Sequence, residues 1–257
     1  MQNLQQYLIL THQKIMEKSL NKALEIEKEY LSIVDSKEQE KFNLKERLEL
    51  CGFTLESFSE AKEDYLFKQA KLEIRETTPA TIQAETMEVI QKGEQVAFII
   101  SQDCNWCFYG IDDANKKYVE DNNIKFLDLG YQGGTIISTP KDLEMVIIIK
   151  QHSINSYIRD SIGKLLNNIG VEHKTNSNDL LIHSDLLIED YKICGFAERN
   201  LGNEYSIYYA QISFEINNEL ISNICVTESK KIPKGINYFY PEVNRDMLVK
   251  EIKQWLQ

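Results

Sequence analysis

The sequence predicts an α+β fold in which a mostly antiparallel sheet with packed helices follows an all-helical N-terminal arm. Glycine and proline are scarce in the N-terminal third of the chain, since Gly52 is the only glycine among residues 1–92 and no proline precedes Pro79. Apolar side chains recur at helical spacing in residues 1–78, whereas short apolar runs and strict alternation dominate residues 79–257. We therefore predict a helical arm over residues 1–78 and an α+β domain over residues 79–257.

Three helices are expected in the arm. The first carries apolar residues on one face, namely Leu20, Leu24, Leu31 and Val34. A second is expected to begin near Ser36, which has a glutamine three residues later as in a capping box. It ends at Gly52, because glycine commonly terminates helices. The third begins after Thr54, a residue that caps helix N-termini, and extends to Ile74.

The stretch from Leu48 to Phe58 is compatible with two structures, a helix-turn-helix reader of DNA or a turn between two packed helices. Residues 1–80 hold 12 basic against 15 acidic side chains. A recognition helix favours basic or amide side chains near its start, whereas this one offers Glu56 and Ser57. We therefore expect packed helices that contact the second domain, a partner protein or another copy of the chain, and no nucleic-acid binding.

The second domain is expected to consist of short strands separated by helices. Predicted strands cover residues 95–101, 124–129, 135–137, 145–149, 179–182, 186–188, 192–198 and 205–216. Predicted helices cover residues 112–120, 153–168, 219–224 and 245–256. The last strand alternates most regularly, with Ile207 and Tyr209 on one face and Tyr208 and Ala210 on the other. This order of elements indicates a mostly antiparallel sheet with helices packed on it.

Composition excludes several classes of protein. The 257 residues carry a formal net charge of -11, which argues against a nucleic-acid-binding protein. The longest apolar runs, residues 96–100 and 145–149, are too short to cross a bilayer of about 30 Å. The N-terminus lacks the basic-then-apolar order of a signal peptide. We therefore expect a cytoplasmic protein with no membrane contact, whose five cysteines are reduced thiols.

The pair Cys104 and Cys107 has the two-residue gap of a redox or zinc site. A zinc site needs two further ligands, yet the sequence has no second cysteine pair, and its four histidines show no ligand spacing. The alternative is an ordinary loop after the first strand of the domain. We favour the loop and expect no metal, and we expect His183 and Asp185 to lie in a hairpin turn.

Three stretches of the second domain occur in an order that resembles a known enzyme superfamily. They are Asn115–Gly134 (NKKYVEDNNIKFLDLGYQGG), Asn178–Ile182 (NDLLI) and Lys192–Glu198 (KICGFAE). Over residues 82–226 the chain resembles, as a divergent member, the catalytic module shared by lipoate–protein ligases, octanoyltransferases and biotin–protein ligases. Members of this superfamily attach lipoate, an eight-carbon acyl chain or biotin to a lysine of a carrier domain.

The resemblance implies roles for seven residues. Lys192 matches the ligase lysine that contacts the reacting carboxyl group, where a fixed ammonium stabilises negative charge developing on the acyl oxygen. Cys225 lies about where the transferase branch has its cysteine nucleophile, although the family's Pro-Cys-Gly is absent. Glycines in the matched loop let an acyl chain approach the backbone closely. The implied substrate-binding residues are Gly133, Gly134, Asn178, Asp179 and Gly195.

Departures from the family pattern narrow the expected chemistry. Asp128 occupies a position where the ligases have an arginine, and a carboxylate would repel nucleotide phosphate rather than bind it. Ser138 replaces the histidine of the family. An ATP-dependent ligase reaction is therefore disfavoured. No cofactor is expected to be required, and lipoate or an octanoyl carrier is the implied substrate.

Two functions are compatible with these observations. The first is an acyltransferase that uses Lys192 as an electrostatic stabiliser and Cys225 as the nucleophile, with an acyl-carrier or lipoyl-domain protein as its partner. The second is a catalytically silent member of the fold that serves as a structural or protein-binding component through residues 1–78. In that case Lys192 is a surface lysine on a hairpin, and Cys225 is a buried structural thiol.

Overall fold

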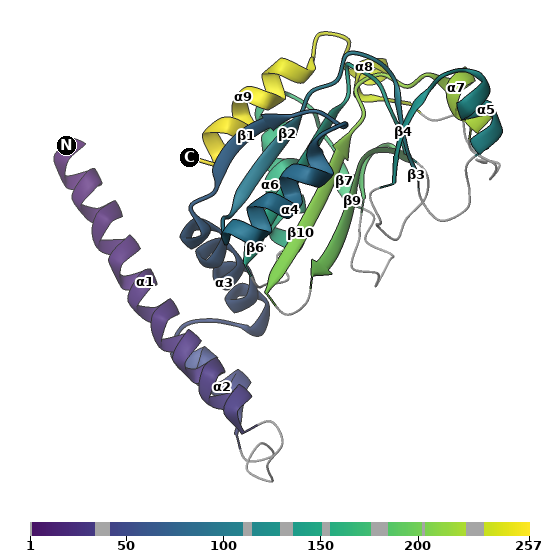
Figure 1. Cartoon of the computed structure of the whole chain (residues 1–257). Coiled ribbons are helices and arrows are strands. Elements are labelled where there is room, and N and C mark those ends of the chain that lie inside the picture. The colour runs from purple at the N-terminus through teal and green to yellow at the C-terminus, as the bar shows by residue number, and fades with distance from the viewer. Residues whose placement is uncertain are drawn as a thin grey trace. The chain divides into compact units, whose positions relative to one another are not determined.

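The computed structural model describes most of the chain, and its parts are labelled in Figure 1. The described residues are 2–33, 42–109, 115–128, 136–150, 155–175, 185–201, 204–224 and 234–257. They divide into two compact units, residues 1–69 and residues 70–257. None of the described helices is long and apolar enough to span a membrane.

In the first unit the described residues form three helices, which are α1 (Gln2–Ser32), α2 (Leu44–Leu50) and α3 (Leu55–Ala70). Their shared core is formed by Leu20, Ala23, Leu48, Phe53 and Phe58. The Lys62 ammonium of α3 lies 2.6 Å from the Glu27 carboxylate of α1, and both side chains are partly buried. The helical arm predicted over residues 1–78 is therefore observed as helices that end at Ala70. Apolar packing holds it together, with a second inter-helix ion pair between Arg47 of α2 and Glu29 of α1 at 3.2 Å.

The second unit is built on a seven-stranded sheet with the strand order β1-β2-β6-β10-β9-β8-β7. Its strands are β1 (Glu73–Thr77), β2 (Val96–Ile100), β6 (Leu143–Lys150), β7 (Lys174–Thr175), β8 (Leu186–Ile188), β9 (Tyr191–Leu201) and β10 (Tyr205–Ile212). Strand β1 runs parallel to β2, and every other neighbouring pair in this sheet is antiparallel. The predicted α+β class with a mostly antiparallel sheet is therefore confirmed.

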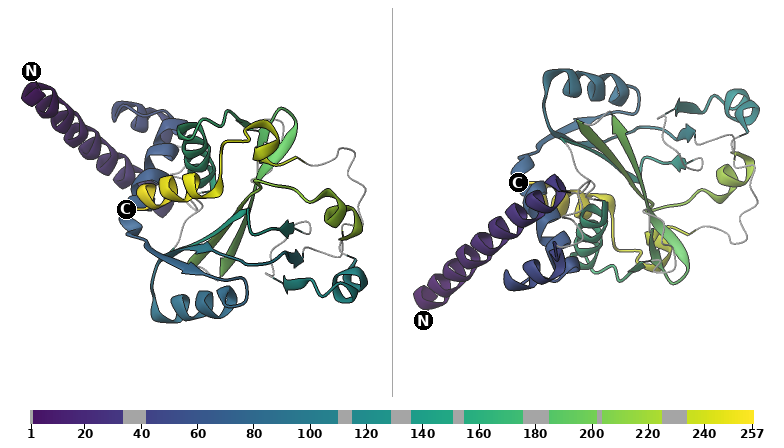
Figure 2. Two further views of the ribbon diagram at one scale, coloured as in Figure 1. Left: turned by 90° about the horizontal axis from the view of Figure 1, so that it is seen from above. Right: turned by 90° about the horizontal axis from the view of Figure 1, so that it is seen from below.

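Helices cover both faces of this sheet, as the two views of Figure 2 show. One face is covered by α4 (Ile82–Lys92), whose Ile82 and Val89 join a core with residues of β2, β6 and β10. The other face is covered by α6 (Asn155–Asn168) and α9 (Arg245–Trp255), which contact each other. The central strands are consequently buried on both sides, and all eight residues of β10 are buried.

A second, smaller sheet has the strand order β4-β3-β5. It consists of β3 (Trp106–Tyr109), β4 (Lys125–Asp128) and β5 (Ile136–Ser138). The described residues of this unit also form three short helices, namely α5 (Lys116–Asp121), α7 (Asn218–Ile224) and α8 (Ile236–Phe239). Val119 of α5 packs against Ile224 of α7, which joins two segments that are far apart in sequence.

Three predictions about local structure were wrong or incomplete. Ile74, which was expected in the third helix, lies in strand β1, because that segment pairs with β2. The segment after Cys104 was expected to be a loop, but it forms strand β3 from Trp106 onward. Helix α4 was not predicted. The strand expected over residues 179–182 lies outside the described residues.

Candidate active site

Strand register places polar side chains side by side at one end of the large sheet. Gly195 of β9 pairs with Gln211 of β10, and Gln211 pairs in turn with Glu144 of β6. Side chains of directly opposite residues point to the same face of a sheet. Gln211 and Glu144 therefore share a face with Gly195. Tyr209, two residues before Gln211 on β10 and thus on the same face, packs in the core that α4 covers. The polar side chains therefore lie on the face of the sheet that α4 covers farther along the strands.

A β-bulge brings Lys192 onto the same face. Leu187 of β8 pairs with Lys192 and Leu186 pairs with Cys194, so β9 has one extra residue here. Strict alternation would place residues 192 and 195 on opposite faces, but an extra residue reverses the alternation. The lysine side chain accordingly crosses Gly195. A Cβ atom added at Gly195 would lie 2.7 Å from Lys192 Cε and 2.9 Å from Lys192 Nζ.

Asp185, just before β8, holds the lysine in this position. Its Oδ1 atom lies 3.0 Å from Lys192 Nζ. The Asp185 side chain is 28% exposed and that of Lys192 is 58% exposed. The ammonium is thus fixed by one carboxylate and by the absence of a side chain at Gly195, while it remains open to solvent and to a ligand.

A buried carboxyl group lies farther along the same polar row. Glu144 is fully buried, and burial raises the pKa of its carboxyl group well above the usual value. The negative charge of Asp142 adds to this rise, and Arg245 opposes it. The Ser138 hydroxyl donates to Glu144 Oε1. The side chain therefore favours its neutral form and is held in a network with the end of β5.

Asp142 fixes the turn between β5 and β6. It accepts hydrogen bonds from the backbone N–H of Thr139 at 2.9 Å, from the Thr139 hydroxyl at 3.1 Å and from the backbone N–H of Phe214 at 2.8 Å. Burial is the main cause that raises the pKa of Asp142 to about 6. Arg245 donates to the backbone carbonyl of Asp142 at 3.2 Å, so α9 also stabilises this turn.

We expect the chain to become less stable as the pH rises from 5 to 7. Asp142 and Glu144 have raised pKa values in the folded state, so the native chain binds more protons than the unfolded chain over this range. For Asp142 the stabilisation is complete below its usual pKa of 3.8 and is lost as the pH rises through about 6. This loss is about 1 kcal/mol between pH 5 and 7, and Glu144 acts in the same direction.

Urea unfolding at the two pH values measures this dependence. Glu144→Gln keeps a hydrogen-bonding side chain but removes the titration, so the variant should show a smaller difference between pH 5 and 7. Stability that increases over this range would contradict the assignment of both groups as buried acids.

Two of the residues implied by the family resemblance are brought together, since Lys192 lies directly over Gly195. The remaining five, Gly133, Gly134, Asn178, Asp179 and Cys225, lie outside the described residues. The sequence predicts only a turn at Asp185, and Glu144 and Gln211 are not among the predicted site residues. Their place in the sequence could have indicated them, because each is a polar residue at a buried position of a largely apolar strand.

The cysteines in the described residues do not form a second candidate centre. Cys194 is buried, and burial raises the pKa of its thiol well above the usual value, so the reactive thiolate is disfavoured. Cys104 is a free thiol. It is followed by strand β3 rather than by a helix. Among the described residues, no group of three or more His, Cys, Asp or Glu side chains is arranged to hold a metal ion.

Comparison with known proteins gives a match at the level of structure. No protein-family model and no curated protein sequence matches the chain. A solved structure of lipoate-protein ligase A bound with ATP is similar with a TM-score of 0.59 and 14% sequence identity, over 70% of this chain and 81% of that chain. The bi-partite lipoate protein ligase from Thermoplasma acidophilum, described with its E2 lipoyl domain, has a TM-score of 0.56 at 13% identity, over 70% and 79% of the two chains.

These similarities confirm the family resemblance inferred from the sequence where the fold is concerned. About 30% of this chain lies outside the structural match, and the sequence identity within it is low. The chain therefore has the fold of the lipoate–protein ligase catalytic module, in a divergent form.

Proposed function

We propose that the chain transfers a lipoyl or octanoyl group to a lysine of a carrier domain. The observation that supports this most directly is the fixed ammonium of Lys192, which Asp185 holds over Gly195 and which remains exposed. A lysine in a bulged strand that needs a glycine beneath it is a specific arrangement. A surface lysine on an ordinary hairpin requires neither the bulge nor the glycine.

The proposed role of Lys192 is to stabilise the oxyanion. When the acceptor amine attacks the acyl carbonyl carbon, the carbonyl oxygen gains negative charge, and a prepositioned ammonium lowers the energy of that state. The ion pair with Asp185 keeps the lysine in place before substrate binds. Since the lysine side chain is more than half exposed, its ammonium is accessible to a substrate oxygen and can donate a hydrogen bond to it.

The proposed acyl donor is a carrier thioester, and Cys225 is the proposed intermediate acceptor. Its thiolate attacks the donor thioester and releases the carrier thiol, and the new Cys225 thioester is then attacked by the acceptor lysine amine. This second step forms the amide and regenerates the thiol, so no ATP is consumed. Asp128 in place of an arginine supports this route over a nucleotide-dependent one, because it disfavours bound phosphate.

Trapping the intermediate tests this route. The full chain is incubated with octanoyl-carrier protein without an acceptor, and its peptides are analysed by mass spectrometry. We expect an octanoyl group on Cys225 and none on Cys194, whose thiol is buried. A folded sample that acquires no acyl group on Cys225 would exclude the thioester route.

Gly195→Ala tests the geometry around Lys192. The added Cβ would displace the far end of the lysine side chain, so we expect the variant to fold and its transfer rate to fall by roughly tenfold to a hundredfold. In a Lys192→Met background the same substitution should cause no further loss, because the group that it displaces is gone. An equal loss in both backgrounds would show that Gly195 acts independently of Lys192.

A silent, protein-binding role is the second proposal, and exposed apolar side chains on the arm support it. Ile15 and Met16 are 58% and 43% exposed on α1, and Leu31 near the end of the same helix is 59% exposed. Contiguous exposed apolar patches mark protein interaction sites, so this role requires these side chains to belong to one such patch. A sample that is monomeric by light scattering and active in acyl transfer would exclude this alternative.

A further inference from the structure

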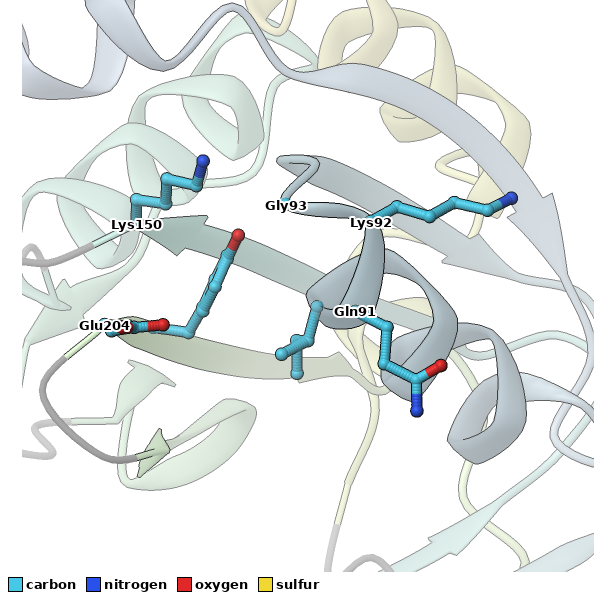
Figure 3. A pocket seen from close by; sticks show the side chains of 7 residues that line it. Gln91, Lys92, Gly93, Lys150 and Glu204 are labelled. Carbon is cyan, nitrogen blue, oxygen red and sulfur yellow. The ribbon is translucent and has the colours of Figure 1, made fainter.

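A pocket at the other end of the large sheet is separate from the candidate active site. It has a volume of about 720 Å³ and is formed by the end of α4, the last residue of β6 and the first of β10 (Figure 3). Its lining residues are Ile90, Gln91, Lys92, Gly93, Lys150, Glu204 and Tyr205. Lys150 lies six residues beyond Glu144 on β6, which corresponds to about 20 Å along a strand.

Two hydrogen-bond donors converge in this pocket, and no acceptor among the described residues is shared by both. Tyr205 is 5% exposed, and its hydroxyl oxygen is buried with no hydrogen-bond partner among the described residues. The position of a Cβ atom on Gly93 would lie 3.6 Å from Lys150 Nζ and 3.9 Å from the Tyr205 hydroxyl. Leaving a buried hydroxyl unpaired is costly. An acceptor atom between the two donors would satisfy both.

The charges of the pocket disfavour a ligand with two negative charges and leave Lys150 as the ammonium available to a ligand. Two ammonium groups and one carboxylate line it, those of Lys92, Lys150 and Glu204. Lys92 is already engaged by Glu88 on the same helix, and Figure 3 shows its side chain extending away from Lys150. The pocket also faces the C-terminal end of α4, where helix carbonyls carry partial negative charge and oppose a dianion. Ile90 and the tyrosine ring add apolar surface.

We infer that this pocket binds a small carboxylate with a short apolar body. One carboxylate oxygen accepts from the Lys150 ammonium and the other from the Tyr205 hydroxyl, while the apolar body lies against Ile90. Gly93 belongs to the site because it adopts a left-handed conformation with φ of 73°, which glycine favours, and leaves the space between the two donors unfilled. This site is independent of the proposed acyl transfer.

Nuclear magnetic resonance titration of the full chain tests the inference, with isovalerate as the probe and the Gly93 amide as the reporter. We expect a saturating shift with a midpoint on the order of millimolar, typical of a small ligand held by few contacts. Inorganic phosphate and isopentylamine, which has an apolar body but a positive charge, should give no saturating shift. No saturation with isovalerate, or tighter binding of phosphate, would overturn the assignment.

Three variants test which residues bind the probe. Lys150→Met should weaken isovalerate binding by at least roughly tenfold, because a charge-assisted hydrogen bond is lost. Tyr205→Phe should weaken it by several-fold, yet leave the unliganded chain as stable as the parent or more stable, since a buried unpaired hydroxyl is removed. Lys92→Met is the matched control and should keep the parental affinity. Unchanged binding in Lys150→Met, or a Tyr205→Phe chain that is clearly less stable without ligand, would contradict the proposed donors.

Discussion

Lys192→Met is expected to lower the rate of acyl transfer by roughly a hundredfold to a thousandfold, the usual loss when one prepositioned oxyanion donor is removed. The rate should be measured in a single turnover with the full chain, an octanoyl-carrier donor and a lipoyl domain. Methionine preserves much of the length and the apolar part of the side chain but removes the ammonium. Since Lys192 is well exposed, the variant should remain folded.

Lys174→Met provides the matched control for this experiment. Lys174 lies on β7 of the same sheet and forms a similar exposed ion pair, at 3.0 Å from Asp190. Lys174 does not lie against a glycine and is not part of the proposed site. Exposed ion pairs have small energetic effects, so Lys174→Met should leave the transfer rate within about twofold of that of the parent chain. Equal rates for Lys192→Met, Lys174→Met and the parent chain would exclude Lys192 from the reaction.

Asp142→Ala is expected to lower the free energy of unfolding by about 3 kcal/mol. The substitution leaves the backbone N–H groups of Thr139 and Phe214 without the carboxylate that accepts from them in a buried turn, and each unpaired buried group costs about 1–3 kcal/mol. Urea denaturation at one pH measures the change. The effect should appear as a shift of the midpoint with an unchanged slope.

The control for Asp142→Ala is Asp190→Ala, which breaks an exposed ion pair and should change the unfolding free energy by less than about 1 kcal/mol. A comparable loss in both variants would mean that the buried hydrogen bonds of Asp142 contribute no more than a surface charge. The β5–β6 turn would then be stabilised mainly by apolar packing.

The parts of the fold with strong periodicity were predictable from the sequence. The central strands β6 and β10 are continuous apolar or alternating runs because both faces of the sheet are covered. Helix α6 shows one apolar face because it packs on that sheet. The arm was predictable because its few glycines and prolines leave long helical patterns uninterrupted.

Other elements depend on tertiary pairing that a sequence pattern does not report. Strand β1 has the sequence EIRET and lies at the edge of the sheet, where charged residues alternate with few apolar ones. Among the strands that the structure describes, its only neighbour is β2, so pairing with β2 rather than hydrophobicity defines this strand. Helix α4 buries only Ile82 and Val89 fully, which leaves a weak periodic signal in eleven residues.

The candidate site was only partly predictable for a similar reason. Lys192 and Gly195 were found through their order in a matched stretch, but their contact requires the bulge opposite Leu186 and Leu187. A bulge is a property of two paired strands, so the β9 sequence alone indicates that residues 192 and 195 face apart. The ion pair with Asp185 likewise depends on how β8 folds back on β9.

The mass of a lipoyl domain after incubation with the full chain and an octanoyl-carrier donor shows whether the chain transfers an acyl group. We expect the domain to gain one octanoyl group on its acceptor lysine, at a rate that Lys192→Met reduces and Lys174→Met does not. A lipoyl domain that stays unmodified with this donor and with lipoate plus ATP, while the chain remains folded, would contradict the proposed acyl transfer.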